Sequence, residues 1–185
     1  MSKYVGIDAA GNLDALFKIS ILFQFILAAP ILSAGLPVVV QALSKGPVDL
    51  KPILYNKLNL LALFFIVAAF LSWCFADFLV SLVFSSEFSS ISDLLLFAIC
   101  IEALRAFSGV FWLVPLAEKK LMIGIVNNVF FTLNIFIGLY VMSLTGILSV
   151  RNVLILYVLA SIVYCLIIFT WTSRWLVLNK KHLNN

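Results

Sequence analysis

LLALFFIVAAFLSWCFADFLVSLV, residues 60–83, contains a single charged side chain, Asp77. A helix needs about 20 apolar residues to cross a hydrocarbon core about 30 Å thick, so this run is long enough to do so. Four further apolar runs reach a comparable length, at residues 12–40, 93–116, 121–143 and 153–173. The sequence therefore predicts an all-α fold, a polytopic membrane helix bundle with five transmembrane helices.

The composition supports the same class. Apolar residues make up 64% of the 185 residues and charged residues 11%, whereas soluble domains are about half apolar and about a quarter charged. The formal net charge of +4 comes from bases in short loops beside apolar helices. Bases in such places set the orientation of the helices and contact anionic lipid head groups, so membrane lipids are expected partners and nucleic acid is not.

Basic residues are concentrated in alternate gaps between the apolar runs. Two of these gaps and the C-terminal tail hold Lys45, Lys51 and Lys57, then Lys119 and Lys120, then Arg174, Lys180 and Lys181. Cytoplasmic loops of membrane proteins are enriched in Lys and Arg, so we expect these gaps and the C-terminus to face the cytoplasm. The N-terminus would then face outward without a secretory signal. We therefore expect that a preceding helix is missing and that the chain is a fragment of a longer protein or a split or truncated reading frame.

Two ionisable residues lie near the middle of the run at 93–116. An ionisable group at that depth costs about 2.5–3.5 kcal/mol on insertion scales. Glu102 and Arg105 are three residues apart, which places them on one helix face and close enough to pair. Two interpretations remain open. The pair is either an internal ion pair that cancels its own insertion cost, or Arg105 lines a hydrated cavity that attracts an anionic lipid head group, with Glu102 tuning it.

Three further polar residues are candidates for a binding site. Asp14 and Lys18 lie one helical turn apart near the start of the first run, where a surface ion pair is the simpler interpretation and substrate contact the alternative. Asn127 belongs to the run at 121–143, together with Asn128 and Asn134. We expect these amides to hold membrane helices together by hydrogen bonds, with substrate contact as the alternative.

Small residues and prolines mark places where helices approach or bend. Gly109, Gly124 and Gly138 are expected to allow close approach between helices. Pro30 and Pro37 lie inside the first run, and a proline in a membrane helix frees a carbonyl and permits a bend.

The sequence contains no constellation typical of an enzyme. It has no histidine–carboxylate cluster, no phosphate-binding glycine loop and no Ser/His/Asp set. Cys74, Cys100 and Cys165 lie inside apolar runs without metal-ligand spacing and are expected to be small buried apolar groups. We therefore expect a protein that is not an enzyme, with no catalytic residue, no metal site and no cofactor.

Three segments resemble a transporter family. The first is GIDAAGNLDALFKI at 6–19, two glycines that lead into a helix, which ends with AGLPV at 34–38. The second is LVSLVFSSEF at 79–88, and the third is PLAEKKL at 115–121, a short basic loop followed by two asparagines. Together they are similar to the C-terminal part of an O-antigen or polysaccharide flippase of the Wzx type. That family belongs to the multidrug/oligosaccharidyl-lipid/polysaccharide exporter superfamily.

The resemblance implies a protein of about twelve spans in two related bundles, of which this chain would supply the last five and would lack about seven. Its substrate would be an undecaprenyl diphosphate that carries a sugar repeat, moved across the bacterial inner membrane from the inner to the outer leaflet. A polysaccharide polymerase and a chain-length regulator would be further partners. Arg105 or Lys18 would attract the diphosphate, and Glu102, Asp14 and Asn127 complete the candidate site. The alternatives are a multidrug exporter of the same superfamily and a non-transport assembly subunit.

Overall fold

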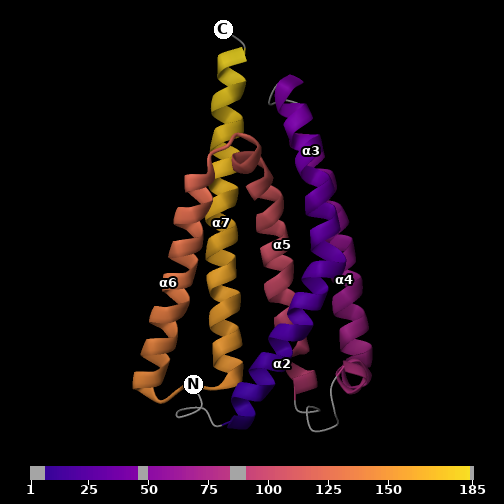
Figure 1. Ribbon diagram of the computed structural model, residues 1–185, viewed down its shortest axis with the longest axis vertical. Helices are drawn as coiled ribbons and strands as arrows, with labels where there is room; N and C mark the ends of the chain where they lie inside the picture. Colours follow the sequence, from indigo (N-terminus) through magenta and orange to yellow (C-terminus); the bar gives the residue numbers. More distant parts are fainter. Residues whose placement is uncertain (1–6, 46–49, 84–90, 184–185) are drawn as a thin grey trace.

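The structure, a computed structural model, describes residues 7–45, 50–83 and 91–183. Their long helices run mostly along a common axis (Figure 1). In chain order the helical segments are α2 (Ile7–Phe23), the π-helical turn η1 (Gln24–Ala28), α3 (Ala29–Lys45), α4 (Leu50–Val83), α5 (Leu95–Ala117), α6 (Leu121–Thr145) and α7 (Val150–Leu183). Residues 91–94 form a 3-10 turn before α5. The described part of the chain contains no strand, which confirms the all-α prediction.

The helices are long and apolar enough to cross a membrane. Four of them meet this requirement individually, and α2 with α3 makes a fifth span if the bent pair is counted as one. Large apolar side chains such as Phe25, Ile66 and Trp73 are about two-thirds exposed on the outside of the bundle. Such exposure is typical of residues that face lipid, whereas soluble proteins rarely expose large apolar patches. The chain is therefore a multi-pass membrane protein, as predicted.

The first predicted span is not one helix. α2 and α3 meet at η1 with a bend of 41°, whereas the sequence predicted a single run at 12–40. Pro30 is the second residue of α3 and lacks the N–H that would bond to the carbonyl of Ile26. A π turn is a common way to accommodate such a missing bond, so the sequence position of Pro30 explains the place of the bend.

Two other helices are longer than predicted. α4 begins at Leu50, not at residue 60, and includes Pro52 in its first turn, where the missing N–H of proline costs nothing. The gap between the first two predicted runs, residues 41–59, is therefore helical over 41–45 and 50–59, and residues 46–49 lie outside the described residues. α7 continues to Leu183, beyond the predicted end at 173.

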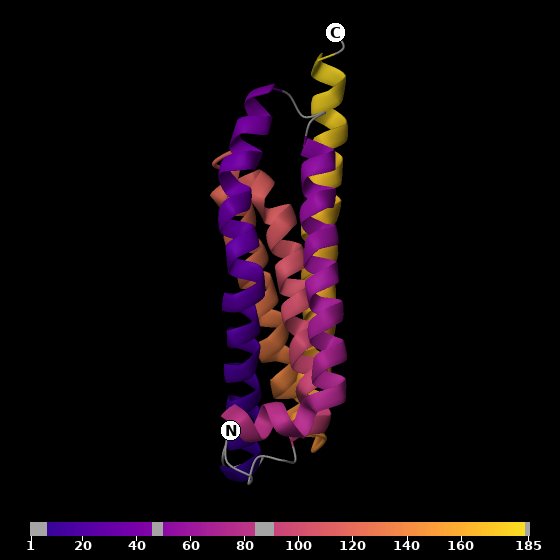
Figure 2. The same cartoon turned by 90° about the vertical axis from the view of Figure 1, so that its right-hand side faces the viewer.

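α4 also changes direction near its C-terminus. Phe75 has non-helical backbone angles, φ −127° and ψ 26°, and the turns that follow it lie across the bundle axis (Figure 2). Asp77 lies in this crosswise segment and is exposed. The straight part of α4 therefore ends near Phe75, inside the candidate span Leu50–Leu82. The family-like segment LVSLVFSSEF lies partly outside the described residues, which resume at residue 91.

α5 is the centre of the bundle. It contacts α2, α3, α4, α6 and α7, and in Figure 1 it lies between α7 and the pair α3 and α4. In its most apolar stretch 44% of residues are buried, against 17–22% for the corresponding stretches of α4, α6 and α7. Leu95, Ile99, Val110 and Val114 are almost completely buried along its length. Residues at the middle of α5 are therefore surrounded by protein at membrane depth.

Glycines fix how closely α3 approaches α5. A Cβ on Gly35 would lie 2.8 Å from Cδ1 of Leu113, and a Cβ on Gly109 would lie 2.9 Å from Cδ1 of Leu32. Each helix thus offers one glycine to receive a leucine of the other. In hydrocarbon, helices associate through such close packing because lipid is as apolar as leucine.

Glycines also allow close approach between α5 and α6 and between α6 and α7. A Cβ on Gly124 of α6 would lie 1.9 Å from the Trp112 ring of α5, and a Cβ on Gly138 would lie 2.6 Å from a methyl group of Leu156 on α7. The close approach predicted for Gly109, Gly124 and Gly138 is confirmed.

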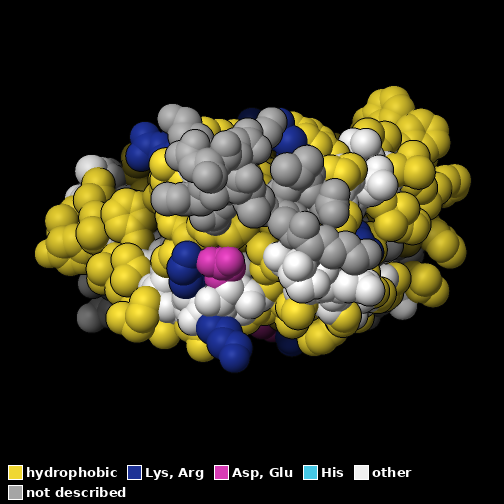
Figure 3. Space-filling view, turned by 90° about the horizontal axis from the view of Figure 1, so that it is seen from above, with side chains coloured by type: hydrophobic (Ala, Val, Ile, Leu, Met, Phe, Trp, Pro, Cys, Tyr) yellow, Lys and Arg dark blue, Asp and Glu magenta, His cyan; other side chains and the backbone are white. Residues whose placement is uncertain are grey.

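The segments rich in basic residues lie at one end of the bundle. The C-terminal end of α3, the turn between α5 and α6, and the C-terminus lie at the top of Figure 1. Seen from that end, hydrophobic side chains cover much of the molecule and Lys and Arg side chains appear at several separate points (Figure 3). In the α5–α6 turn Lys120 forms an ion pair with Glu118 at 2.8 Å. This arrangement is the one that the alternating charge pattern requires.

Candidate functional site

Glu102 is the most deeply buried charged side chain among the described residues. It lies at the middle of α5 and its side chain is 0% exposed. Arg105 donates from Nη1 to Glu102 Oε1 at 2.9 Å, which confirms the predicted pair. Ser20 of α2 also donates its hydroxyl to Oε1. A single carboxylate oxygen therefore joins α2 to α5 and holds the guanidinium group.

The second oxygen of Glu102 is not used in this way. Oε2 is buried and has no hydrogen-bond partner within the described part of the chain. A buried acceptor without a partner usually costs about 1–3 kcal/mol, and more if it is charged. Because of this cost, stability alone does not explain why a carboxylate occupies this position.

Arg105 is placed differently from its partner. Its side chain is 36% exposed, and its guanidinium carbon lies 5.9 Å from the centre of the Phe131 ring on α6. This distance is within the range of a cation–π interaction. A guanidinium group has five N–H donors, and the bond to Glu102 uses one of them. Arg105 can therefore offer further donors to an anion in the middle of the bundle.

An aromatic and amide cluster adjoins Arg105. Phe131 packs edge-on against Tyr164 of α7, with ring centres 5.6 Å apart. The Tyr164 hydroxyl donates to Oδ1 of Asn128 at 3.1 Å, which links α7 to α6. Sequence reasoning did not single out Phe131 or Tyr164. The chain has 17 Phe and 5 Tyr, and no spacing distinguishes these two.

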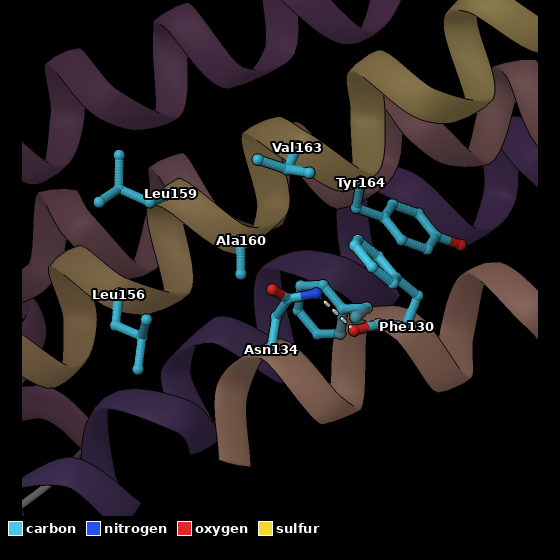
Figure 4. A pocket seen from close by; sticks show the side chains of 8 residues that line it. Phe130, Asn134, Leu156, Leu159, Ala160, Val163 and Tyr164 are labelled. Atoms are coloured by element: carbon cyan, nitrogen blue, oxygen red, sulfur yellow. Dashed lines mark hydrogen bonds between the residues drawn. The ribbon is translucent and has the colours of Figure 1, made fainter. Parts of the chain in front are cut away.

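A pocket opens between α6 and α7 next to this cluster, with a volume of about 170 Å³ (Figure 4). We call it the α6–α7 pocket. It is lined by Phe130, Phe131, Asn134, Leu156, Leu159, Ala160, Val163 and Tyr164. The amide nitrogen of Asn134 donates to the carbonyl of Phe130 at 2.7 Å, drawn as a dashed line in Figure 4. The pocket is thus mainly apolar and aromatic.

Asn127 does not make the hydrogen bond expected of it. Its side chain is buried, and neither Nδ2 nor Oδ1 has a partner among the residues described. Asn127 lies one turn from Gly124, on the face of α6 that meets α5, where backbone groups are already bonded within their helix. The prediction of an interhelical bond was wrong for Asn127 and for Asn134, which donates to the Phe130 carbonyl of its own helix. It is confirmed for Asn128.

Asp14 and Lys18 form the predicted ion pair. Nζ of Lys18 lies 2.6 Å from Oδ2 of Asp14, and both side chains are more than 60% exposed. Neither takes part in the hydrogen bonds around Glu102. The five candidate residues therefore fall into a central pair, a surface pair and a separate buried amide.

The cysteines differ from expectation. Cys74 and Cys100 are exposed, and Cys165 is half-buried. The prediction that all three are buried was wrong for the first two, because an apolar run in a membrane has a lipid-facing side on which a thiol is tolerated. Over the described ranges, no three His, Cys, Asp or Glu residues come together as a metal site would require.

Comparison of the chain with models of protein families, with characterised proteins and with solved structures gives no match. The class that the structure supports is therefore that of a multi-pass membrane protein.

Proposed function

We propose that this chain is part of a carrier that moves a lipid-linked oligosaccharide with a diphosphate head across the bacterial inner membrane. The observation that carries the proposal is Arg105. It is a permanent cation at the middle of the central helix, and 36% of its side chain stays exposed although Glu102 is bonded to it. A charge at that depth is expensive and usually faces a partner or a hydrated path.

The chemistry of the pair suits a diphosphate head. The planar fork of a guanidinium group matches two phosphate oxygens and binds them more strongly than neutral donors would. Glu102 neutralises Arg105 between transport events, so an incoming phosphate has to compete with a carboxylate. Binding is then weak enough to be reversed, which passage through a membrane requires.

The rest of the proposal follows from the charge pattern and the family resemblance. The basic end of the bundle would face the cytoplasm, together with the C-terminus. The five helices would be the last five spans of a longer flippase, whose other bundle would cover the exposed side of Arg105. A polymerase and a chain-length regulator of polysaccharide synthesis would act on the same substrate.

Binding of a polyprenyl diphosphate to the 185-residue chain in lipid nanodiscs tests the role of Arg105. Arg105→Gln removes a charge-assisted bond of about 1.5–3 kcal/mol, so we expect Kd to rise about 10- to 150-fold. Arg151→Gln is the matched control, since Arg151 is an exposed arginine near the start of α7. Equal affinity of R105Q and the unaltered chain would refute the proposal. In cells that lack a flippase, we expect the chain alone not to restore transport.

A multidrug exporter of the same superfamily is a second candidate, favoured by the unpartnered Oε2 of buried Glu102. A cation exporter needs such a carboxylate. Glu102→Gln would then abolish binding of a lipophilic cation such as tetraphenylphosphonium. For the flippase we expect the same variant to retain or strengthen diphosphate binding, because Arg105 loses its competitor. A chain that binds neither probe would indicate a non-transport assembly subunit.

A further inference from the structure

The α6–α7 pocket has the character of a site for an apolar group. It lies on the outside of the bundle, where Phe130, Leu159 and Val163 are between 46% and 56% exposed. The side chains of α6 and α7 surround it from both sides (Figure 4). Ala160 is buried beneath it, and its small side chain leaves the space open. The pocket can therefore be entered directly from the lipid.

The volume of the pocket limits what can occupy it. An apolar cavity of about 150 Å³ in a soluble protein binds a benzene ring, so 170 Å³ has room for a group of similar size. A branched five-carbon isoprene unit meets this limit. Three aromatic rings line the pocket, so it suits a branched, unsaturated chain better than a saturated acyl chain.

Of the described residues that line the pocket, only Asn134 and Tyr164 have polar side chains, and each already donates one hydrogen bond. The Asn134 amide nitrogen donates to the Phe130 carbonyl, and the Tyr164 hydroxyl donates to Asn128. A sugar ring in the pocket would leave most of its hydroxyl groups without partners, and each would cost about 1–3 kcal/mol. An apolar occupant has no such cost.

Phe131 connects this pocket to the cation of the central pair. It lines the pocket, and the guanidinium carbon of Arg105 lies 5.9 Å from the centre of its ring. A chain seated in the pocket would therefore hold the phosphate end of the same lipid close to Arg105. We propose that the α6–α7 pocket binds an isoprene unit of the polyprenyl chain whose diphosphate head Arg105 receives. This inference rests on the proposed function for the identity of the lipid.

Photolabelling tests the pocket without using the head group. A photoreactive polyprenol, which has no phosphate, and a photoreactive phosphatidylglycerol are each added to nanodiscs that hold the 185-residue chain. We expect the polyprenol to label α6 and α7 around the pocket about fivefold more than the exposed face of α4, which corresponds to about 1 kcal/mol of preference. The phospholipid should label both surfaces equally. Equal labelling by the polyprenol, or the same preference for the phospholipid, would overturn the proposal.

Substitutions make the test specific. Ala160→Phe fills the pocket and should reduce polyprenol labelling there to the level of α4. Val163→Phe narrows the exposed rim and gives a second variant if A160F does not fold. Leu144→Phe changes a lipid-facing residue of α6 outside the pocket and should change nothing. Unaltered labelling in a folded A160F or V163F chain would contradict the assignment.

The outcome separates the two proposals. Polyprenol labelling should persist in R105Q, because the probe has no phosphate. If the polyprenol labels the pocket but diphosphate binding does not depend on Arg105, the proposed function is refuted and the pocket remains a polyprenyl site. Diphosphate binding that depends on Arg105, without pocket labelling, would refute the pocket and keep the function.

Discussion

Gly124 gives the sharpest test of how the helices are held together. An alanine at this position would place its Cβ 1.9, 2.2 and 2.5 Å from three ring atoms of Trp112. Non-bonded carbon atoms do not approach each other this closely. A rigid indole ring cannot relieve the contact by moving one methyl group, as a leucine side chain can. We therefore expect Gly124→Ala to separate α6 from α5, the contact that positions Phe131 over Arg105.

The magnitude follows from two opposing effects. Overpacking in a well-packed core costs about 1–3 kcal/mol, and three contacts with a rigid ring indicate the upper end. Replacing a helical glycine by alanine gains about 1 kcal/mol, so the net loss of stability should be about 2 kcal/mol. Gly138→Ala meets only the flexible end of Leu156 at 2.6 Å and should be near neutral. Gly11→Ala, with nothing within 4 Å, should stabilise the chain.

Unfolding by SDS in mixed micelles, followed by circular dichroism, measures the series. The expected order of stability is G11A, then G138A, then G124A. Trp112→Ala provides the decisive background, since removal of the indole should eliminate the cost of G124A even though W112A is itself less stable. If G124A costs the same in both backgrounds, or if it is as stable as G11A, the assigned packing of α6 on α5 is refuted.

Three further predictions address the polar residues and the topology. Glu102→Gln and Arg105→Gln should each lower the free energy of unfolding by about 1–3 kcal/mol, which is less than for a fully buried pair because the arginine is partly exposed. The double variant should lower it little further, and additive losses would contradict the ion pair. Asn127→Leu should raise stability by about 1–2 kcal/mol in the same SDS assay, because it removes an unbonded buried amide, and a loss would reveal a partner for it. Cysteines placed at Lys45 and Lys119, after the three native cysteines are replaced by Ala, should react with an impermeant reagent from the same side of the membrane, and reaction from opposite sides would overturn the topology.

Apolar length was sufficient to predict the membrane bundle, because a span needs little beyond about 20 residues without charges. The ends of the helices were less accessible to this reasoning. The first turns of α4 contain Lys51, Asn56 and Lys57, which interrupt the apolar run without interrupting the helix. A helix that extends beyond the hydrocarbon no longer needs apolar residues, so hydropathy alone underestimates its length.

The site was predictable only where its contacts are local. Glu102 and Arg105 pair across three residues of one helix, and that spacing is visible in the sequence. Ser20 reaches Glu102 from 82 residues away, and no local pattern indicates this contact. The choice between Asn127 and Asn128 depends on the rotation of α6 about its axis, which packing on α5 and α7 sets.

The central position of α5 has a consequence for how the chain assembles. A ribosome delivers α2, α3 and α4 to the bilayer before α5 has been made. Yet α5 packs against α3 at Gly35, and its Glu102 accepts the hydrogen bond of the Ser20 hydroxyl. The early helices would therefore remain loosely associated in lipid and would become ordered together when α5, the third span, arrives. Maturation of the bundle is then governed by one event, the entry of α5 into a space that its predecessors keep open.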